Sequence, residues 1–404
     1  MNAQDTRVPA EPHASAEFSR RLQAAADANP ALADRLAAHH FDPASAHSPA
    51  DLDALPVQSK DELLASRAHL SPRFTPRRVF QSPGPIYEAQ PPGPDPWRWG
   101  EALSAAGLQP GDVVANCFGY HLSPAGAMFD EAITAAGATV LPAGIGSQQL
   151  QVQALMDLGI RGYVGLPSYF KALIDVCAAA GGSPESFPVR WALVTAEPLP
   201  DQLRTALQEW VPQVRMAYGS AEAGLIAYED GQGAGMVTAA GVDVAVCDIT
   251  TGSRLDAGEG EVVLSLIRAE APLVRFGTGD LSAWVTDESG TPVTDEQGRR
   301  RLAGVLGRVG QAVKVRGMFL HPRQAASVMD RVDGVAAYRF VISRSAHRDD
   351  VRCEIVPAAG AAAEAVCTSA AEEIRAGLRF NAEVQIVTEL PADGQTLVDT
   401  RSWD

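Results

Sequence analysis

The pattern of apolar and polar positions changes character three times along the chain. Residues 14–40 carry Ala and Leu at i, i+3, i+4 spacing, which predicts a helix, and 97–107 predict a second one. From residue 113 short apolar runs alternate with segments of helical periodicity, which is typical of a parallel sheet covered by helices. The expected strands lie at 113–120, 139–144, 162–167, 191–197 and 214–220, and the expected helices at 123–136, 148–158, 168–180 and 200–210.

Beyond residue 235 the pattern changes to strands and turns, and 311–404 follow the order β, α (323–333), β, β, α (361–378), β. Gly304, Gly307 and Gly310 interrupt a strand-like run and mark a boundary near 307–310. We therefore predict an α/β protein. Residues 1–309 form a large N-terminal domain of βα-layered sheets with a β-rich subdomain, and 310–404 form a small, mobile α+β C-terminal lid domain.

Composition limits the classes of function. The chain has 404 residues, 46% of them hydrophobic, and its formal net charge of −16 argues against nucleic-acid binding. No apolar run approaches the length of a membrane helix and the polar N-terminus does not resemble a signal peptide, so we expect a cytoplasmic protein without a membrane partner. The cysteines form no CxxC pair, and we expect reduced thiols and no bound metal: Cys117, Cys177, Cys247, Cys353 and Cys367.

Six short motifs occur in a particular order. "AYGSAEAG" (217–224) ends a buried strand in a turn with one carboxylate, "RFGTGDLS" (275–282) places an aspartate at a glycine turn, and "GRVGQAVKVRGMFLHP" (307–322) follows. "GYHLSPAGAMF", "VLPAG" and "TAEPL" precede them. Over roughly residues 50–404 this set resembles the phenylacetate–CoA ligase branch of the acyl-adenylating superfamily.

The resemblance implies two half-reactions. ATP and an aryl carboxylate give an aryl adenylate, and after rotation of the C-terminal domain the CoA thiol displaces AMP. It assigns Tyr218 to adenine stacking, Glu222 to magnesium, Asp280 to the ribose hydroxyls and Arg308 to ribose and phosphate. A flat ring suits adenine and a carboxylate suits a diol. The alternative is that Asp280 caps a turn and Tyr218 fills the core.

The resemblance also implies binding residues for the acyl group and for coenzyme A. The segment "NCFGYHLSPAG" (116–126) resembles the lining of the aryl pocket, and the hairpin in "KVRGMFLHP" resembles the element that lines the pantetheine tunnel. The substrate-binding candidates are Phe118, Gly126, Ala196, Glu197, Pro198, Tyr218, Gly219 and Ser220. The nucleotide- and CoA-binding candidates are Asp280, Arg308, Lys314, Arg316 and Gly317.

Two side chains in the 116–126 segment are candidates for chemistry. His121 can polarise an acyl carbonyl or take a thiol proton near neutral pH, and Tyr120 and Glu222 complete the catalytic candidates. The alternative for His121 is a histidine bonded to backbone at a helix start. Cys117 is a candidate acyl-carrying nucleophile, although a free cysteine in a strand is more often buried packing.

Two departures from the family pattern affect the ATP half-reaction. Where the family has a Ser/Thr/Gly run followed by Lys, this chain has residues 82–87, in which Pro83 and Pro85 lack the N–H that a phosphate loop uses. Near the C-terminus, "ELPADGQTLVDTR" (389–401) places Gln395 where the family has its catalytic lysine. Arg401 is a possible substitute for it, although a guanidinium is not interchangeable with an ammonium.

A basic stretch suggests an acceptor. Arg299, Arg300, Arg301, Arg308, Lys314 and Arg316 occur without an acid between 299 and 316, which favours contact with CoA phosphates or an acidic carrier protein over a solvated strand face.

The first hypothesis is an acyltransferase that has lost adenylation and moves an aryl group from aryl-CoA to an acyl carrier protein thiol. It requires no cofactor, and residual ATP, AMP and Mg²⁺ binding stay open. The alternatives are an ATP-dependent aryl-CoA ligase of phenylacetate, benzoate or anthranilate type and a non-catalytic aryl-CoA-binding protein. The sequence names neither the aryl acid nor the oligomeric state.

Overall fold

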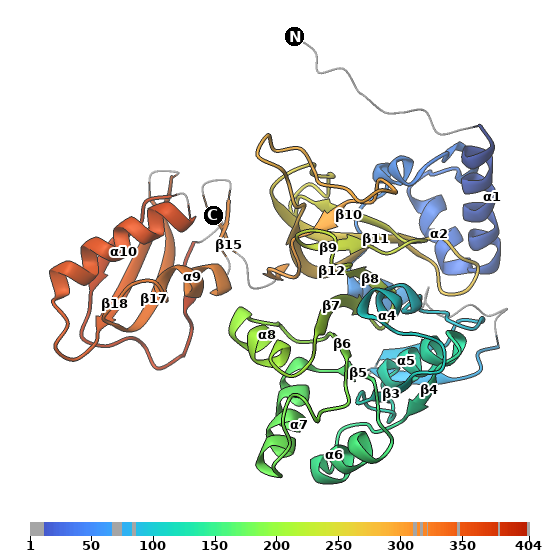
Figure 1. Ribbon diagram of the computed structural model, residues 1–404. Coiled ribbons are helices and arrows are strands. Elements are labelled where there is room, and N and C mark those ends of the chain that lie inside the picture. Colours follow the sequence, from blue (N-terminus) through green and yellow to red (C-terminus); the bar gives the residue numbers. More distant parts are fainter. Residues whose placement is uncertain are drawn as a thin grey trace. The chain divides into compact units, whose positions relative to one another are not determined.

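The computed structural model describes residues 12–66, 75–82, 86–309, 313–315, 318–320, 322–345, 348–378 and 380–401. The chain separates into two compact units. The first comprises residues up to 278 together with 282–305, and the second comprises 279–281 together with 306–404. Their architecture is mixed α/β, as the sequence predicts. Figure 1 labels many of the elements of each unit.

The centre of the first unit is an eight-stranded sheet of order β13-β9-β8-β7-β6-β5-β3-β4. Strands β4, β3, β5, β6 and β7 run parallel, and β8, β9 and β13 continue the sheet antiparallel. The strands are β3 (Val113–Asn116), β4 (Thr139–Leu141), β5 (Gly162–Gly165), β6 (Trp191–Val194), β7 (Gln213–Ser220), β8 (Gly224–Tyr228), β9 (Met236–Thr238) and β13 (Arg301–Leu302). The expected strands exist, but β3, β4 and β6 end earlier than the apolar runs suggest because the chain turns at their carboxyl ends.

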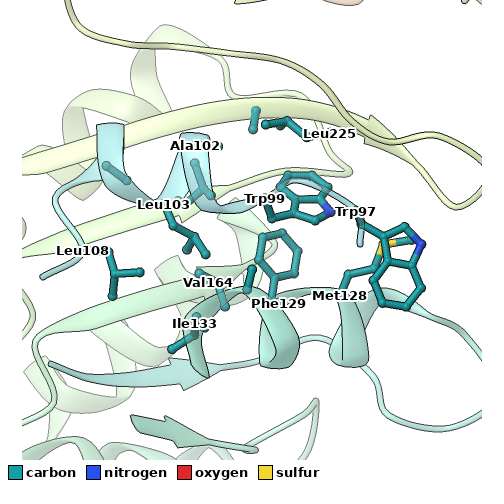
Figure 2. Packing of buried hydrophobic residues seen from close by; sticks show 14 of the residues in the cluster. Trp97, Trp99, Ala102, Leu103, Leu108, Met128, Phe129, Ile133, Val164 and Leu225 are labelled. Carbon is teal, nitrogen blue, oxygen red and sulfur yellow. The ribbon is translucent and has the colours of Figure 1, made fainter. Parts of the chain in front are cut away.

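Helices cover both faces of this sheet. The five are α4 (Gly100–Ala106), α5 (Ala125–Ala135), α6 (Gln148–Asp157), α7 (Pro167–Ala179) and α8 (Asp201–Gln208). Successive strand residues point to opposite faces: Val164 packs with α4 and α5, as in Figure 2, whereas Tyr163 packs with α6, α7 and α8. Strands buried on both faces explain why the sequence shows continuous apolar runs there.

The N-terminal region contains two helices where the sequence predicts one. α1 (Pro12–Ala28) and α2 (Pro30–Ala38) are separated by Asn29, whose side-chain oxygen accepts the backbone N–H of Leu32 at 3.0 Å. Asn29 therefore caps α2, and Pro30, which has no N–H, occupies its first turn. The remaining elements are η1 (Pro43–Ser45), η2 (Pro49–Ala54), α3 (Lys60–Ser66), β1 (Val79–Ser82) and β2 (Ile86–Ala89).

A second sheet, of order β10-β11-β12-β14, provides the β-rich region predicted after residue 235. Its strands are β10 (Asp243–Cys247), β11 (Glu259–Leu266), β12 (Leu273–Ala283) and β14 (Gly307–Arg308). Asp53, in η2, accepts hydrogen bonds from Arg254 and Arg275 and links the N-terminal segment to this sheet. The side chain of Arg275 is 3% exposed, so this pair is largely shielded from solvent.

The second unit is a small α+β fold. A hairpin of β15 (Val313–Val315) and β16 (Met318–Leu320) precedes a four-stranded sheet of order β19-β18-β17-β20. Its other elements are α9 (Pro322–Met329), β17 (Val335–Ser345), β18 (Arg348–Pro357), α10 (Ala363–Leu378), β19 (Glu383–Ile386) and β20 (Leu397–Asp399). Gly310, one of the three glycines that mark the predicted boundary, lies outside the described residues. Within the described parts of both units, none of the helices combines the length and apolarity needed to traverse a bilayer.

Candidate active site

The turn between β7 and β8 carries the carboxylate of the "AYGSAEAG" motif. Tyr218 is buried at the end of β7, and the Ser220 Oγ accepts the Ala223 N–H at 3.2 Å, which closes the turn. Gly219 lies against the Trp99 ring, and a Cβ there would come within 2.7 Å of it. The glycines of this motif therefore allow the Trp97–Trp99 segment, seen in the core of Figure 2, to pack directly against the turn.

Two arginines hold the backbone of the same turn. Arg98 Nη2 donates to the carbonyl oxygens of Ala223 at 2.7 Å and Leu225 at 2.9 Å, and Arg268 Nη2 donates to the Glu222 carbonyl at 3.4 Å. Burial and the nearby charge of Arg98 lower the pKa of Arg268 to about 9, and burial also lowers the pKa of Arg98. Both guanidiniums thus place positive charge in a poorly solvated region beside the turn.

The Glu222 carboxylate has a partner that the sequence interpretation missed. Lys60 Nζ, at the first residue of α3, lies 2.6 Å from Glu222 Oε1; the Glu222 side chain is 7% exposed and that of Lys60 46%. Ser59 and Glu62 form a capping box around this helix start, with Glu62 Oε2 accepting the Ser59 N–H at 2.8 Å. The S-x-x-E pattern and the scarcity of lysine, which leaves Lys60 and Lys171 alone before Lys314, are the signals that point to it.

The carboxyl ends of the parallel strands form the edge where open α/β sheets bind ligands. Of the residues expected there, Phe118 stacks on Phe129 with ring centroids 4.9 Å apart and is buried, so it belongs to the core. Asn116 Nδ2 donates to the Tyr120 hydroxyl and to the Gly126 carbonyl, each at 2.8 Å. A Cβ at Gly126 would approach the Tyr120 ring to 2.9 Å, so only a glycine at this position leaves room for that ring at the edge of the sheet.

The catalytic candidates of the 116–126 segment have different outcomes. Burial raises the pKa of Cys117 to about 12, so at neutral pH it stays a thiol. Burial of the thiol thus favours packing over the interpretation of Cys117 as an acyl-carrying nucleophile. Burial also raises the pKa of the Tyr120 hydroxyl, which favours a hydrogen-bonding role over proton abstraction. The His121 side chain is exposed beside Leu122, whose φ of 61° marks a sharp bend before α5.

The "TAEPL" residues follow β6. Ala196 has a φ of 69°, an uncommon value for alanine that bends the chain away from the sheet. Glu197 Oε2 accepts from the Ser168 hydroxyl at 2.5 Å and from the Ser168 N–H at 3.4 Å, in the first turn of α7. Glu197 therefore caps α7, while Pro198 is exposed.

The nucleotide candidates of the second unit include one close pair. Arg308 Nε lies 2.7 Å from Asp280 Oδ1, because Asp280 on β12 pairs with Arg308 on β14. Lys314 lies on β15 opposite Phe319, whereas Arg316 and Gly317 fall outside the described residues, as do Pro83 and Pro85 of the loop. Gln395 is exposed, and its N–H donates to Asp393 Oδ1 at 3.0 Å.

Three arginines of the basic stretch have acidic partners in the described part of the chain. Arg299 Nη1 lies 2.8 Å from Glu101 Oε2, and Arg300 pairs with Asp256 and stacks over Trp284. The three consecutive arginines are thus paired with acids brought by other elements, which the linear sequence does not reveal.

Replacing Arg301 is expected to destabilise the first unit by about 3 kcal/mol, because the change leaves the carboxylate of Asp230 buried without its partner. The Arg301 side chain is 3% exposed and donates to both Asp230 oxygens, at 2.9 and 2.6 Å. Arg300→Ala, at the neighbouring and 40% exposed side chain, should cost less than about 1 kcal/mol. Denaturant unfolding of both variants is the measurement, and equal losses would contradict this assignment.

The residues around the Glu222 turn supply only one protein ligand that suits Mg²⁺. Among the described residues no group of three or more His, Cys, Asp or Glu side chains could hold a metal ion. Mg²⁺ is commonly bound by one or two carboxylates together with substrate phosphates and water. Glu222 fits that role as a single ligand once its Oε1 is released by Lys60.

Comparison with known proteins gives relatives of one kind. No family model matches the chain. Phenylacetate–coenzyme A ligase from Thermus thermophilus is 28% identical over 263 residues, covering 63% of this chain and 58% of the relative, and that from Pseudomonas putida is 26% identical over 267 residues, covering 63% and 58%. The chain thus matches less than two thirds of the length of these relatives.

Solved structures share the fold. An open conformation of 2-hydroxyisobutyryl-CoA ligase, in complex with 2-HIB-AMP and CoA, superimposes with a TM-score of 0.82 at 20% identity, covering 99% of this chain and 97% of that one. The apo form of MatB from Rhodopseudomonas palustris gives a TM-score of 0.51 at 18% identity, covering 82% and 70%.

Proposed function

Because the chain belongs to the phenylacetate–CoA ligase-like branch of the acyl-adenylating superfamily, we propose that it joins an aromatic carboxylic acid to coenzyme A with ATP. The observation that carries the proposal is the ammonium of Lys60, 2.6 Å from Glu222 in the motif associated with adenylation. It supplies a cation to a site whose loop at 82–87 lacks the family's lysine. The ligase, first written as the alternative, is thereby favoured over loss of adenylation, and the relatives support the same choice.

The proposed reaction has two steps. A carboxylate oxygen attacks the α-phosphorus of ATP, the bond between that phosphorus and the bridging oxygen breaks, and pyrophosphate leaves. The CoA sulfur, after losing its proton, then attacks the acyl carbon, and AMP leaves with the electron pair of the broken C–O bond. Bound Mg²⁺, held by Glu222 and phosphate oxygens, would supply positive charge to the phosphates.

The chain's own residues have distinct tasks in this proposal. Arg98 and Arg268 fix the turn through its carbonyls, so the Glu222 carboxylate is presented in one orientation. Tyr218 offers a ring to adenine. Asp280 accepts from ribose hydroxyls, and Arg308, held against it, gives the local positive charge that a phosphate needs. The identity of the aromatic acid is set by the edge formed by Tyr120 and Gly126.

The second candidate function is transfer of an aryl group from aryl-CoA to another thiol, such as that of a carrier protein, without ATP. Gln395 favours it, because a neutral amide cannot offset the charge that develops during adenylation. Arg401 does not replace the lysine: its Nε and Nη2 donate to Asp399 at 2.9 and 2.7 Å, and its side chain is 5% exposed. The pairing of Arg299, Arg300 and Arg301 with acids reduces the free positive charge that the sequence argument for an acidic carrier partner used.

Measurement of pyrophosphate release distinguishes the ligase function from the transferase function. The purified chain with ATP, Mg²⁺ and a panel of benzoate-, phenylacetate- and anthranilate-type acids should release pyrophosphate at about 0.01–0.1 s⁻¹, below an ordinary ligase because one donor is missing. Addition of CoA should yield the aryl-CoA. Asp280→Asn serves as a control: it should lower acid-dependent pyrophosphate release, whereas ATP-independent exchange between aryl-CoA and a thiol should not respond to it. ATP-independent exchange between aryl-CoA and a free thiol, without acid-dependent pyrophosphate release, would establish the transferase instead.

A further inference from the structure

We propose that Lys60 is an exchangeable polyphosphate-binding residue. It neutralises Glu222 while the site holds no nucleotide, and it passes to the β- and γ-phosphate oxygens when ATP binds. The inference rests on the proposed ligase function and adds a specific residue to it. The ammonium that the loop at 82–87 does not supply comes from the N-terminal segment, at the start of α3.

The exposure of the two partners allows the exchange. Glu222 is fixed and nearly buried, at 7% exposure, whereas the Lys60 side chain reaches it from a position 46% exposed. Water reaches the half-exposed Lys60 ammonium, although it hardly reaches the Glu222 carboxylate, so the lysine end of the pair is open to competing anions. A polyphosphate carrying several negative charges is a stronger partner for this ammonium than one carboxylate.

Three cations, Lys60, Arg98 and Arg268, lie around the turn of Glu222. The carboxylates of Asp95 and Glu101 act on Arg98, and that of Glu270 acts on Arg268, so part of the arginine charge is balanced. Across the described part of the chain neither arginine has a carboxylate within ion-pair distance; both donate to backbone carbonyls. The arginines are occupied in holding the turn, so they act as positioning residues, and only the Lys60 ammonium can move to a ligand.

The other lysines of the chain are placed differently. Lys171 Nζ lies 2.5 Å from Asp175 Oδ1 along α7, in an i,i+4 pair on the far side of the sheet from α4 and α5. Lys314 belongs to the β15–β16 hairpin of the second unit. Lys60 is thus the one lysine whose ammonium the described structure places beside the Glu222 turn.

The start of helix α3 is held by a cap, and this cap fixes the backbone position of Lys60. The Glu62 carboxylate accepts the Ser59 N–H at 2.8 Å and the Ser59 hydroxyl at 3.0 Å. These hydrogen bonds lower the pKa of Glu62, so it stays ionised at neutral pH and keeps the cap. The cap holds the backbone of Lys60 while its four-carbon side chain remains free to swing between partners.

The experiment compares phosphate chains of different length. Binding of pyrophosphate, ATP and AMP is measured by titration calorimetry, without Mg²⁺, on the full chain and on Lys60→Met, Lys60→Arg, Glu222→Gln and Lys171→Met. Lys60→Met should weaken the binding of pyrophosphate and of ATP at least 10-fold, because one charged hydrogen bond to the longer phosphate chains is lost. The affinity for AMP should change less than twofold. Lys60→Arg should restore part of the loss, and Lys171→Met should leave all three ligands unchanged.

Glu222→Gln gives the decisive second measurement. If Glu222 competes for Lys60, removing its charge should tighten Mg²⁺-free pyrophosphate binding about two- to fivefold. A lysine that only stabilised the turn would give no such gain. Unchanged pyrophosphate affinity in Lys60→Met, or no pyrophosphate binding by the parent chain, would overturn the proposal. Pyrophosphate binding that depends on Lys60, without any acid-dependent adenylate, would instead leave it standing and refute the ligase function.

Discussion

Replacing Gln395 with lysine is expected to raise the rate of acid-dependent pyrophosphate release by about 100-fold, because it restores one positively charged donor to the adenylation step. The substitution adds little strain. Gln395 is exposed in the 391–396 loop, which borders a cavity of about 570 Å³ in the second unit, and only its backbone N–H is engaged, by Asp393. A lysine at this position can extend into solvent without burying its charge.

Two controls isolate the charge. Gln395→Met has similar length and no charge, and should leave the rate within about threefold of the parent chain. Formation of aryl-CoA from a synthetic aryl adenylate and CoA should also be unaffected by Gln395→Lys, since the added donor serves only the first step. A lysine variant no faster than the methionine variant would mean that the loop does not present residue 395 to the reacting groups.

Replacing Gly224 with alanine is expected to lower the free energy of unfolding by about 4 kcal/mol. Two causes act together. Gly224 has a φ of 75°, a left-handed value that costs an alanine about 1–2 kcal/mol. An added Cβ would also lie 2.4 Å from the backbone oxygen of Trp97, which cannot move without displacing the tryptophan from the core in Figure 2.

Gly258→Ala is the matched control. Gly258 has a φ of 88°, and an added Cβ would have no atom within 4 Å, so this variant carries only the backbone strain and should cost about 1 kcal/mol. Chemical denaturation followed by tryptophan fluorescence reports on the region directly, because Trp97 and Trp99 lie in it. Equal losses in the two variants would show that the contact with Trp97 contributes nothing to stability.

Short-range patterns carried much of the fold. Alternating apolar runs and helical periodicity identified the parallel strands and their helices, because a strand buried on both faces must be apolar throughout. The break between α1 and α2 was missed, although Asn29 and Pro30 are local signals for it, because the Ala- and Leu-rich periodicity continues across them. Ordered motifs also located the turn of Glu222 and the pairing region of Asp280 and Arg308.

The ion pairs between residues that are distant in sequence were decided by the tertiary structure. The sequence by itself determined the alternating α/β architecture, the glycine-rich turn of Glu222, the prolines at 82–87 and the glutamine at 395. Only folding brought Lys60 to within 2.6 Å of a carboxylate 162 positions further along the chain (222 − 60), and only folding neutralised Arg301 with Asp230. The physical reason is that periodicity and turn chemistry act over a few residues, whereas the charge balance of a site depends on which distant side chains the packed elements bring together.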